Sequence, residues 1–220
     1  MQEQLMNMPT VFPILSKGQH KCAYDRIEIL FNTLLNTSVV QKRRDFDWDV
    51  HLIDNDDIQN SFILPGGHLY MYSGLIKYLQ TESELVAVLG NEIAYADQEL
   101  ILIALIEAHG NVTMSNLSTG RKVPNLVEIL TGLPNLVHDE KSVFDADAVS
   151  ISLICPFQYD ATSLKRFVEK AEQSQIAWIR SKKGSINERV QHLEMLSASC
   201  GMDEATFEER YMSFKKNCME

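Results

Sequence analysis

Residues 84–97 read E-L-V-A-V-L-G-N-E-I-A-Y-A-D, and residues 60–72 before them read N-S-F-I-L-P-G-G-H-L-Y-M-Y. Thr81, followed three residues later by Glu84, is typical of a capped helix start, and the helical pattern continues towards His109. The earlier stretch predicts two short strands joined by a turn at residues 65–67, P-G-G. The sequence therefore predicts a strand-turn-strand unit that leads into a long helix.

The regions on either side extend this pattern to the whole chain. A strand over residues 45–53 is indicated by apolar residues that alternate with Asp47, Asp49 and His51. Residues 110–125 are rich in Asn, Ser, Thr and Gly and are typical of a loop. Helices are expected near residues 22–40, 125–131, 141–154, 160–180, 186–199 and 203–217. Strands early and helices late predict one α+β domain over residues 1–220, with a small antiparallel sheet, a core at 22–200 and a helical tail at 201–220.

Composition limits the classes of partner. The chain has 220 residues, 45% of them hydrophobic, with a formal net charge of -10 and a pI near 5.1. Such an acidic chain disfavours binding to nucleic acid and to anionic membranes. The longest apolar run, Leu100 to Ile106, is far shorter than the ~18 residues of a membrane-spanning helix. We expect a soluble protein without a transmembrane segment, and the oligomeric state is left open.

The cysteines and the first residues bear on the compartment. None of the four cysteines, Cys22, Cys155, Cys200 and Cys218, forms a C-x-x-C pair, so isolated buried thiols are the expectation. One disulfide is the alternative if the protein is exported. Residues 1–10 contain no apolar signal-peptide core. The compartment is left open between the cytoplasm and export with a signal that has been removed.

The motifs resemble the zinc metallopeptidase family numbered 48, which includes the CAAX prenyl protease and the mitochondrial Oma-type proteases. In that family an N-A-F-x-x-P-G-G edge strand precedes a helix reading G-H-E-I-A-H, and residues 60–67 and 90–95 match both frames. Residues 143–147, V-F-D-A-D, match the frame of a third signature, E-x-x-A-D. The resemblance covers residues 58–172 and, more weakly, 187–196. It implies a mainly helical, zincin-like domain with an edge strand beside the active-site helix.

The same resemblance reveals departures at all three zinc ligands. Asn91 and Tyr95 stand at the two histidine positions, and Val143 stands at the third ligand position. The H-E-x-x-H motif works because residues at i and i+4 share one helix face, so that two imidazoles meet one ion. An amide is a weak donor, a tyrosine with a pKa near 10 must first ionise, and valine offers no donor. We therefore expect the family's zinc to be lost and no cofactor to replace it.

Glu92 keeps the general-base position of the motif. Without a metal it has no activated water, since free water keeps a pKa near 15.7. The resemblance places Asp147 and Arg189 as supporting residues around the metal position. Lys183-Gly184 stands where these peptidases carry a His-Pro pair, a further loss around the site.

The edge strand is expected to keep its role in peptide binding. Proteases of this kind hold the substrate as an added strand. The matching backbone here is supplied by Asn60, Ser61, Phe62 and Ile63. An ordinary edge strand, protected by a loop, fits the same residues.

These observations favour a catalytically inactive metallopeptidase-like protein, a pseudoprotease that binds a peptide or a partner protein in the former substrate cleft. One alternative is an active metallo-endopeptidase with a rearranged metal site that involves His68, Glu92 and Asp147. Another alternative is a structural interaction module that uses its helical surface. The family is one of enzymes, and the lost ligands are the reason to expect no activity from this chain.

Overall fold

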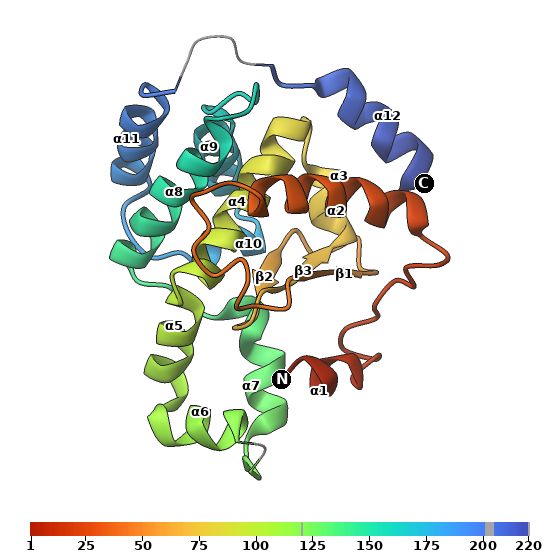
Figure 1. The fold of residues 1–220 in the computed structure, drawn as a ribbon, viewed down its shortest axis with the longest axis vertical. Helices are drawn as coiled ribbons and strands as arrows, with labels where there is room; N and C mark the ends of the chain where they lie inside the picture. Colours follow the sequence, from red (N-terminus) through yellow and green to blue (C-terminus); the bar gives the residue numbers. More distant parts are fainter. Residues whose placement is uncertain (120, 201–204, 220) are drawn as a thin grey trace.

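The computed structural model describes residues 1–119, 121–200 and 205–219, and it confirms a mainly helical α+β domain (Figure 1). The long helices of the core are α2 (Lys21–Leu35), α4 (Glu82–Asp97), α8 (Glu140–Ile154), α9 (Ser163–Ser174) and α11 (Ile186–Ser197). The remaining helices are α1 (Gln2–Met6), α3 (Ser73–Tyr78), α5 (Leu100–His109), α6 (Asn111–Ser118), α7 (Leu126–Gly132), α10 (Ala177–Arg180), α12 (Glu208–Cys218) and the 3-10 turn η1 (Leu133–Asn135).

The sheet has three strands, β1 (Asp49–Ile53), β2 (Ser61–Ile63) and β3 (His68–Tyr72), in the order β1-β3-β2. Strand β2 pairs with β3 in the antiparallel sense, as the turn at residues 65–67 predicts. Strand β1 instead pairs with β3 in the parallel sense. The sheet is therefore mixed, and the prediction of an antiparallel sheet is wrong for the β1–β3 pair.

The loop after β1 explains the parallel pairing. The amide of Asn55 donates to Ser73 Oγ at 3.0 Å, and the amide of Gly74 donates to the carbonyl of Asn55 at 3.1 Å. A Cβ at position 74 would collide with the backbone of Asp56, so glycine permits this close approach. The end of β1 is thereby fixed beside the end of β3, and the chain must pass β3 before β2 begins.

Helix α4 forms the centre of the domain, and all of its residues are buried. One face of the sheet and α2 pack on one side of it, while α8 and α9 pack on the other side (Figure 1). Gly90 lets α8 approach closely, because a Cβ there would lie 2.9 Å from Ser150 Oγ. The start of α4 is capped as predicted, with the amide of Glu84 donating to Thr81 Oγ1 at 3.1 Å. The helix that carries the candidate site is thus rigidly held.

The second face of the sheet is covered by the N-terminal segment and by the arm of helices α5, α6 and α7, which lies below the sheet in Figure 1. Part of the predicted loop at residues 110–125 is helical, since α6 begins immediately after Gly110. The predicted helix at 160–180 is divided into α9 and α10 by Gln175, which has a left-handed backbone. Among the described residues no single helix has the length and apolarity to cross a bilayer; α5 and α6 meet that test only as a pair bent by 118°.

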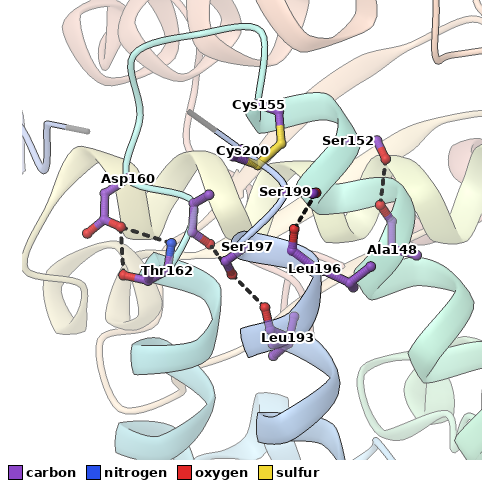
Figure 2. The surroundings of a disulfide bond; sticks show 11 residues. Ala148, Ser152, Cys155, Asp160, Thr162, Leu193, Leu196, Ser197, Ser199 and Cys200 are labelled. Carbon is purple, nitrogen blue, oxygen red and sulfur yellow. Dashed lines mark hydrogen bonds between the residues drawn. A yellow bond between two sulfur atoms is a disulfide. The ribbon is translucent and has the colours of Figure 1, made fainter. Parts of the chain in front are cut away.

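The four cysteines form two disulfides, so the expectation of isolated thiols is wrong. Cys22 at the start of α2 is bonded to Cys218 at the end of α12, with a Cα–Cα distance of 5.4 Å. Cys155, which follows α8, is bonded to Cys200 beyond α11, with a Cα–Cα distance of 5.2 Å (Figure 2). Both distances suit a disulfide. The pairs connect residues 196 and 45 positions apart, a relation that spacing alone does not reveal.

We expect the protein, denatured without reductant, to show no thiol that reacts with Ellman's reagent, and four after reduction. Replacing Cys22 and Cys218 together by serine should lower the free energy of unfolding by about 2–4 kcal/mol, because the unfolded chain regains entropy. Chemical denaturation measures this change. Free thiols before reduction would contradict the pairing.

Candidate functional site

The two helices α4 and α8 bring the expected site residues together. Asn91 and Tyr95 lie one turn apart on α4, and Val143 and Asp147 lie one turn apart on the facing helix α8. All four residues are buried. The structure thus places these residues on two helices that pack against each other.

Asp147 is the centre of a buried polar network. Arg189 on α11 binds it with two hydrogen bonds, Nε to Oδ2 at 2.7 Å and Nη2 to Oδ1 at 2.8 Å. Asn91 Nδ2 donates to the same Oδ1 at 3.0 Å. Burial opposes the charge of Arg189, but the carboxylate of Asp147 more than offsets this and raises the pKa of Arg189 above its usual value. The network joins three helices through one paired carboxylate.

Glu92 is buried and is held by two donors. Ser61 Oγ on β2 donates to Glu92 Oε1 at 2.7 Å, and the indole nitrogen of Trp178 on α10 donates to the same oxygen at 3.2 Å. These bonds satisfy Oε1 and fix the orientation of the carboxylate. Glu92 thus connects the edge strand to α4, whether or not it takes part in chemistry.

A lysine that the sequence did not single out enters this site. Lys182 Nζ lies 4.0 Å from the ring centroid of Trp178 and 5.1 Å from that of Tyr95. Burial lowers the pKa of Lys182 to about 8, while Glu92 and Asp147 act in the opposite direction and favour its charged form. The side chain is therefore an ammonium at pH 7, stacked on two aromatic rings. Lys183, which the sequence highlighted, is exposed.

His138 is a second residue that the sequence did not single out. Its ring centroid lies 4.3 Å from that of Tyr95, and its backbone pairs with the Ser181–Lys183 segment through two hydrogen bonds. Burial, and then the charge of Lys182, lower the pKa of His138 to about 3, so the ring is neutral at pH 7. The sequence contains one indication of this region: residues 181–183, with which His138 pairs, include the first residue of the altered Lys183-Gly184 pair.

The cavity between these groups is small, with a volume of about 10 Å³. It is lined in part by Ser61, Glu92, Tyr95, His138 and Lys182. A volume of this size has room for about one water molecule. The turn η1 and the residues after it close the cavity from outside, and Asn60 Nδ2 donates to the carbonyl of Pro134 at 2.6 Å. The site is thus closed by its own chain.

The edge-strand residues lie beneath this cover. Asn60, Ser61, Phe62 and Ile63 are all buried, and β2 forms one edge of the sheet as expected. Ser61 points towards Glu92 on the α4 side. The structure therefore places these residues next to the site, under η1.

A family model describes most of the chain. Peptidase family M48 matches residues 25–196, which include α4, α8 and Arg189. The chain belongs to peptidase family M48.

Curated relatives cover a shorter part of the chain. The chain is 24% identical to the mitochondrial metalloendopeptidase OMA1 of Arabidopsis thaliana over 124 residues, which are 56% of this chain and 25% of that protein. It is 25% identical to the Beta-barrel assembly-enhancing protease of Escherichia coli K12 over 132 residues, 54% of this chain and 27% of that protein. Over 52 residues, 24% of this chain and 10% of that protein, it is 36% identical to mitochondrial metalloendopeptidase OMA1 of Bos taurus. The matches span about a quarter or less of these relatives.

The donor set at the M48 metal position does not fit zinc. Asn91 offers an amide oxygen, Val143 offers nothing, and burial raises the pKa of Tyr95 well above its usual value, so its phenol stays neutral. Asn91 Oδ1 and the Tyr95 hydroxyl lack partners among the described residues. The two cations, Lys182 and Arg189, already balance the carboxylates of Glu92 and Asp147. A divalent ion would leave two uncompensated positive charges in a buried site, which is strongly unfavourable.

The rearranged metal site of the active-enzyme alternative is not brought together. His68 lies on β3 beside Asp49 and His51, on the sheet face that carries Tyr70 and Tyr72. Glu92 lies on the opposite face, where it contacts Ser61. His68 and Glu92 are therefore separated by the sheet.

The pKa of Lys182 leads to a prediction for stability. An unfolded lysine titrates at 10.5 and the folded one at about 8, so between these pH values the unfolded chain binds more protons. The free energy of unfolding should therefore rise with pH across this window, by up to about 3 kcal/mol from this residue. Lys182→Met should lack the rise. The free energy of unfolding of the wild type minus that of the variant should therefore increase from pH 8 to pH 10.5.

Urea denaturation at fixed pH steps measures this difference. Lys183→Met, at the exposed neighbouring position, is the matched control, and its difference from wild type should stay constant. A constant difference for Lys182→Met as well would contradict the buried position of the ammonium.

Proposed function

We propose that this M48 chain is a catalytically silent domain that binds an extended peptide or a segment of a partner protein along β2. The observation that carries the proposal is the ammonium of Lys182 beside Glu92 in a cavity of about 10 Å³. That cavity has room for neither a hydrated metal nor a scissile peptide. A fixed side-chain cation thus takes over the electrostatic role of a metal without its Lewis acidity.

The contacts of Glu92 also argue against catalysis. A general base of this kind removes a proton from metal-bound water, whose pKa falls from 15.7 to about 7 on zinc. Glu92 Oε1 instead accepts hydrogen bonds from Ser61 and Trp178. These bonds give the carboxylate a structural role, since they link β2, α4 and α10.

Peptide binding is supported by the position of β2. It forms an edge of the sheet, and an edge strand binds an extended peptide by adding one more strand. The edge is covered by residues 133–136, which are held to it by the Asn60–Pro134 hydrogen bond. A bound peptide must therefore displace this segment, which acts as an internal competitor.

The relatives and the disulfides give this proposal a setting. The named relatives are an endopeptidase and an assembly-enhancing protease. We propose that this chain still binds protein segments, as such proteases do, but does not cleave them. Two disulfides are typical of an oxidising compartment outside the cytosol. A partner in that compartment, with an accessible extended segment, fits the covered edge.

The absence of catalysis is tested with an unfolded substrate. We expect the protein, supplied with zinc, to leave β-casein intact on a time scale of hours, and Glu92→Gln to give the same result. Gel electrophoresis with and without chelator measures the cleavage. Cleavage that needs zinc and disappears in Glu92→Gln would contradict the proposal.

Peptide binding is tested by loosening the cover. Asn60→Asp removes the donor to Pro134 but keeps the oxygen that accepts from the Ser61 amide at 3.0 Å. We expect this variant to bind fluorescein-labelled β-casein several-fold more tightly than wild type, because the competing segment is released. Fluorescence anisotropy measures the affinity, and hydrogen exchange at residues 133–136 should rise in parallel.

A surface variant distinguishes binding along β2 from the alternative, in which the helical surface is the binding site. Val127 is 64% exposed and lies on α7, outside the edge strand. If Val127→Lys abolishes casein binding while Asn60→Asp leaves it unchanged, the helical surface is the binding site and the proposed edge is not used.

A further inference from the structure

A second cluster of ligand-type side chains lies on the sheet, away from α4. Asp49 and His51 are two residues apart on β1, so their side chains lie on the same face. His68 on β3 is directly paired with Asp49. One carboxylate oxygen and one ring nitrogen from each histidine lie within 4.8 Å of one another. The pairing of β1 and β3 thus fixes three metal-type ligands at one point.

The two histidines have unused ring nitrogens. His51 and His68 are buried, and His51 Nε2 and His68 Nδ1 have no hydrogen-bond partner among the described residues. A buried polar atom without a partner destabilises the fold unless a ligand or water satisfies it. The remaining contact of the cluster is long, with His51 Nε2 at 3.5 Å from Asp49 Oδ2. The unpartnered His51 Nε2 therefore faces a partly used carboxylate, and one ring nitrogen of His68 lies within 4.8 Å of both.

The charges around the cluster suit a cation at one oxygen of Asp49. Asp49 Oδ1 accepts from Lys17 Nζ at 2.5 Å and from the Val50 amide at 2.8 Å. Oδ2 is the oxygen on the His51 side. The ammonium of Lys17 is in direct contact with Asp49, and its charge opposes the binding of a metal.

An open pocket gives access to the cluster. Its volume is about 510 Å³, and it is lined by Asp49, His51, Lys17 and residues of the N-terminal segment. A metal ion can therefore reach Asp49 Oδ2 and His51 from solvent without opening the core. The covered cavity at α4 offers no such path.

We propose that Asp49, His51 and His68 form a binding site for Zn²⁺, distinct from the metal position of the peptidase family. Two imidazoles and a carboxylate are a ligand set that zinc accepts, with further positions open to water. The three ligand atoms already lie within 4.8 Å of one another, and zinc would draw them to bonds of about 2.0–2.2 Å around one centre. The site would join β1 to β3 and so stabilise the sheet when metal is bound.

The test is a zinc titration of the folded protein after treatment with EDTA and desalting, by calorimetry and by competition with a chromophoric chelator. We expect one zinc ion per chain. His51→Ala and His68→Ala should each weaken binding by roughly 100-fold, since loss of one ligand of three exceeds the 10–100-fold effect of an outer partner. Lys17→Ala should strengthen binding several-fold, because it frees Asp49 and removes a nearby positive charge.

Two controls locate the ion. His109→Ala, at the end of α5, and Tyr95→Phe, at the α4 position, should bind zinc as wild type does. Circular dichroism checks that each variant is folded, and Asp49→Asn, at a half-exposed position, takes over if a histidine variant does not fold. No zinc binding by wild type, or unchanged binding in His51→Ala and His68→Ala, would overturn the proposal. Loss of binding in Tyr95→Phe would place the ion at α4 and contradict the proposed function as well.

Discussion

The burial of the Lys182 ammonium among two aromatic rings and two carboxylates is the constraint around which the site is organised. An ion in a protein interior is tolerated only when opposite charges and oriented groups compensate it. Glu92 and Asp147 provide that compensation, while the second cation, Arg189, opposes the charge of Lys182 and is itself paired with Asp147. Because the two cations offset the two carboxylates, no metal ion is required to neutralise the site. The same four charges hold α4, α8, α11 and the segment after α10 together.

The rest of the scaffold excludes water from these charges and fixes their positions. Gly90 allows α8 to lie close to α4, and Ser61 ties the edge strand to Glu92. The cover at residues 133–136 excludes solvent, and the disulfides tie the outer helix α12 and the end of α8 to the domain. The polar site and the sheet cluster of Asp49, His51 and His68 lie on opposite sides of the sheet, so that each side has its own chemistry.

Local sequence patterns predicted the parts of the fold that depend on neighbouring residues. Thr81 caps α4 and residues 65–67 form the turn, as predicted, and Asn91, Tyr95 and Val143 lie on the two packed helices α4 and α8. Features that depend on residues far apart were missed: the parallel β1–β3 pair set by Gly74, both disulfides, and the inward position of Lys182. A lysine carries no sequence signal for burial, because only the aromatic rings and carboxylates around it make burial tolerable. The positions of the family motif could thus be identified from the sequence, whereas the buried Lys182 beside them could not.

Rebuilding the metal site shows whether the Lys182 ammonium excludes a metal ion. In a His51→Ala background, which removes the sheet ligand, zinc affinity is measured for the variant Asn91→His, Tyr95→His, Val143→Glu, and for the same variant with Lys182→Met. If the ammonium excludes the metal, the variant with Lys182→Met should bind zinc at least about 100-fold more tightly, because the competing charge is gone. Equal affinities in the two proteins would show that Lys182 does not hold the metal's place, and would contradict the account.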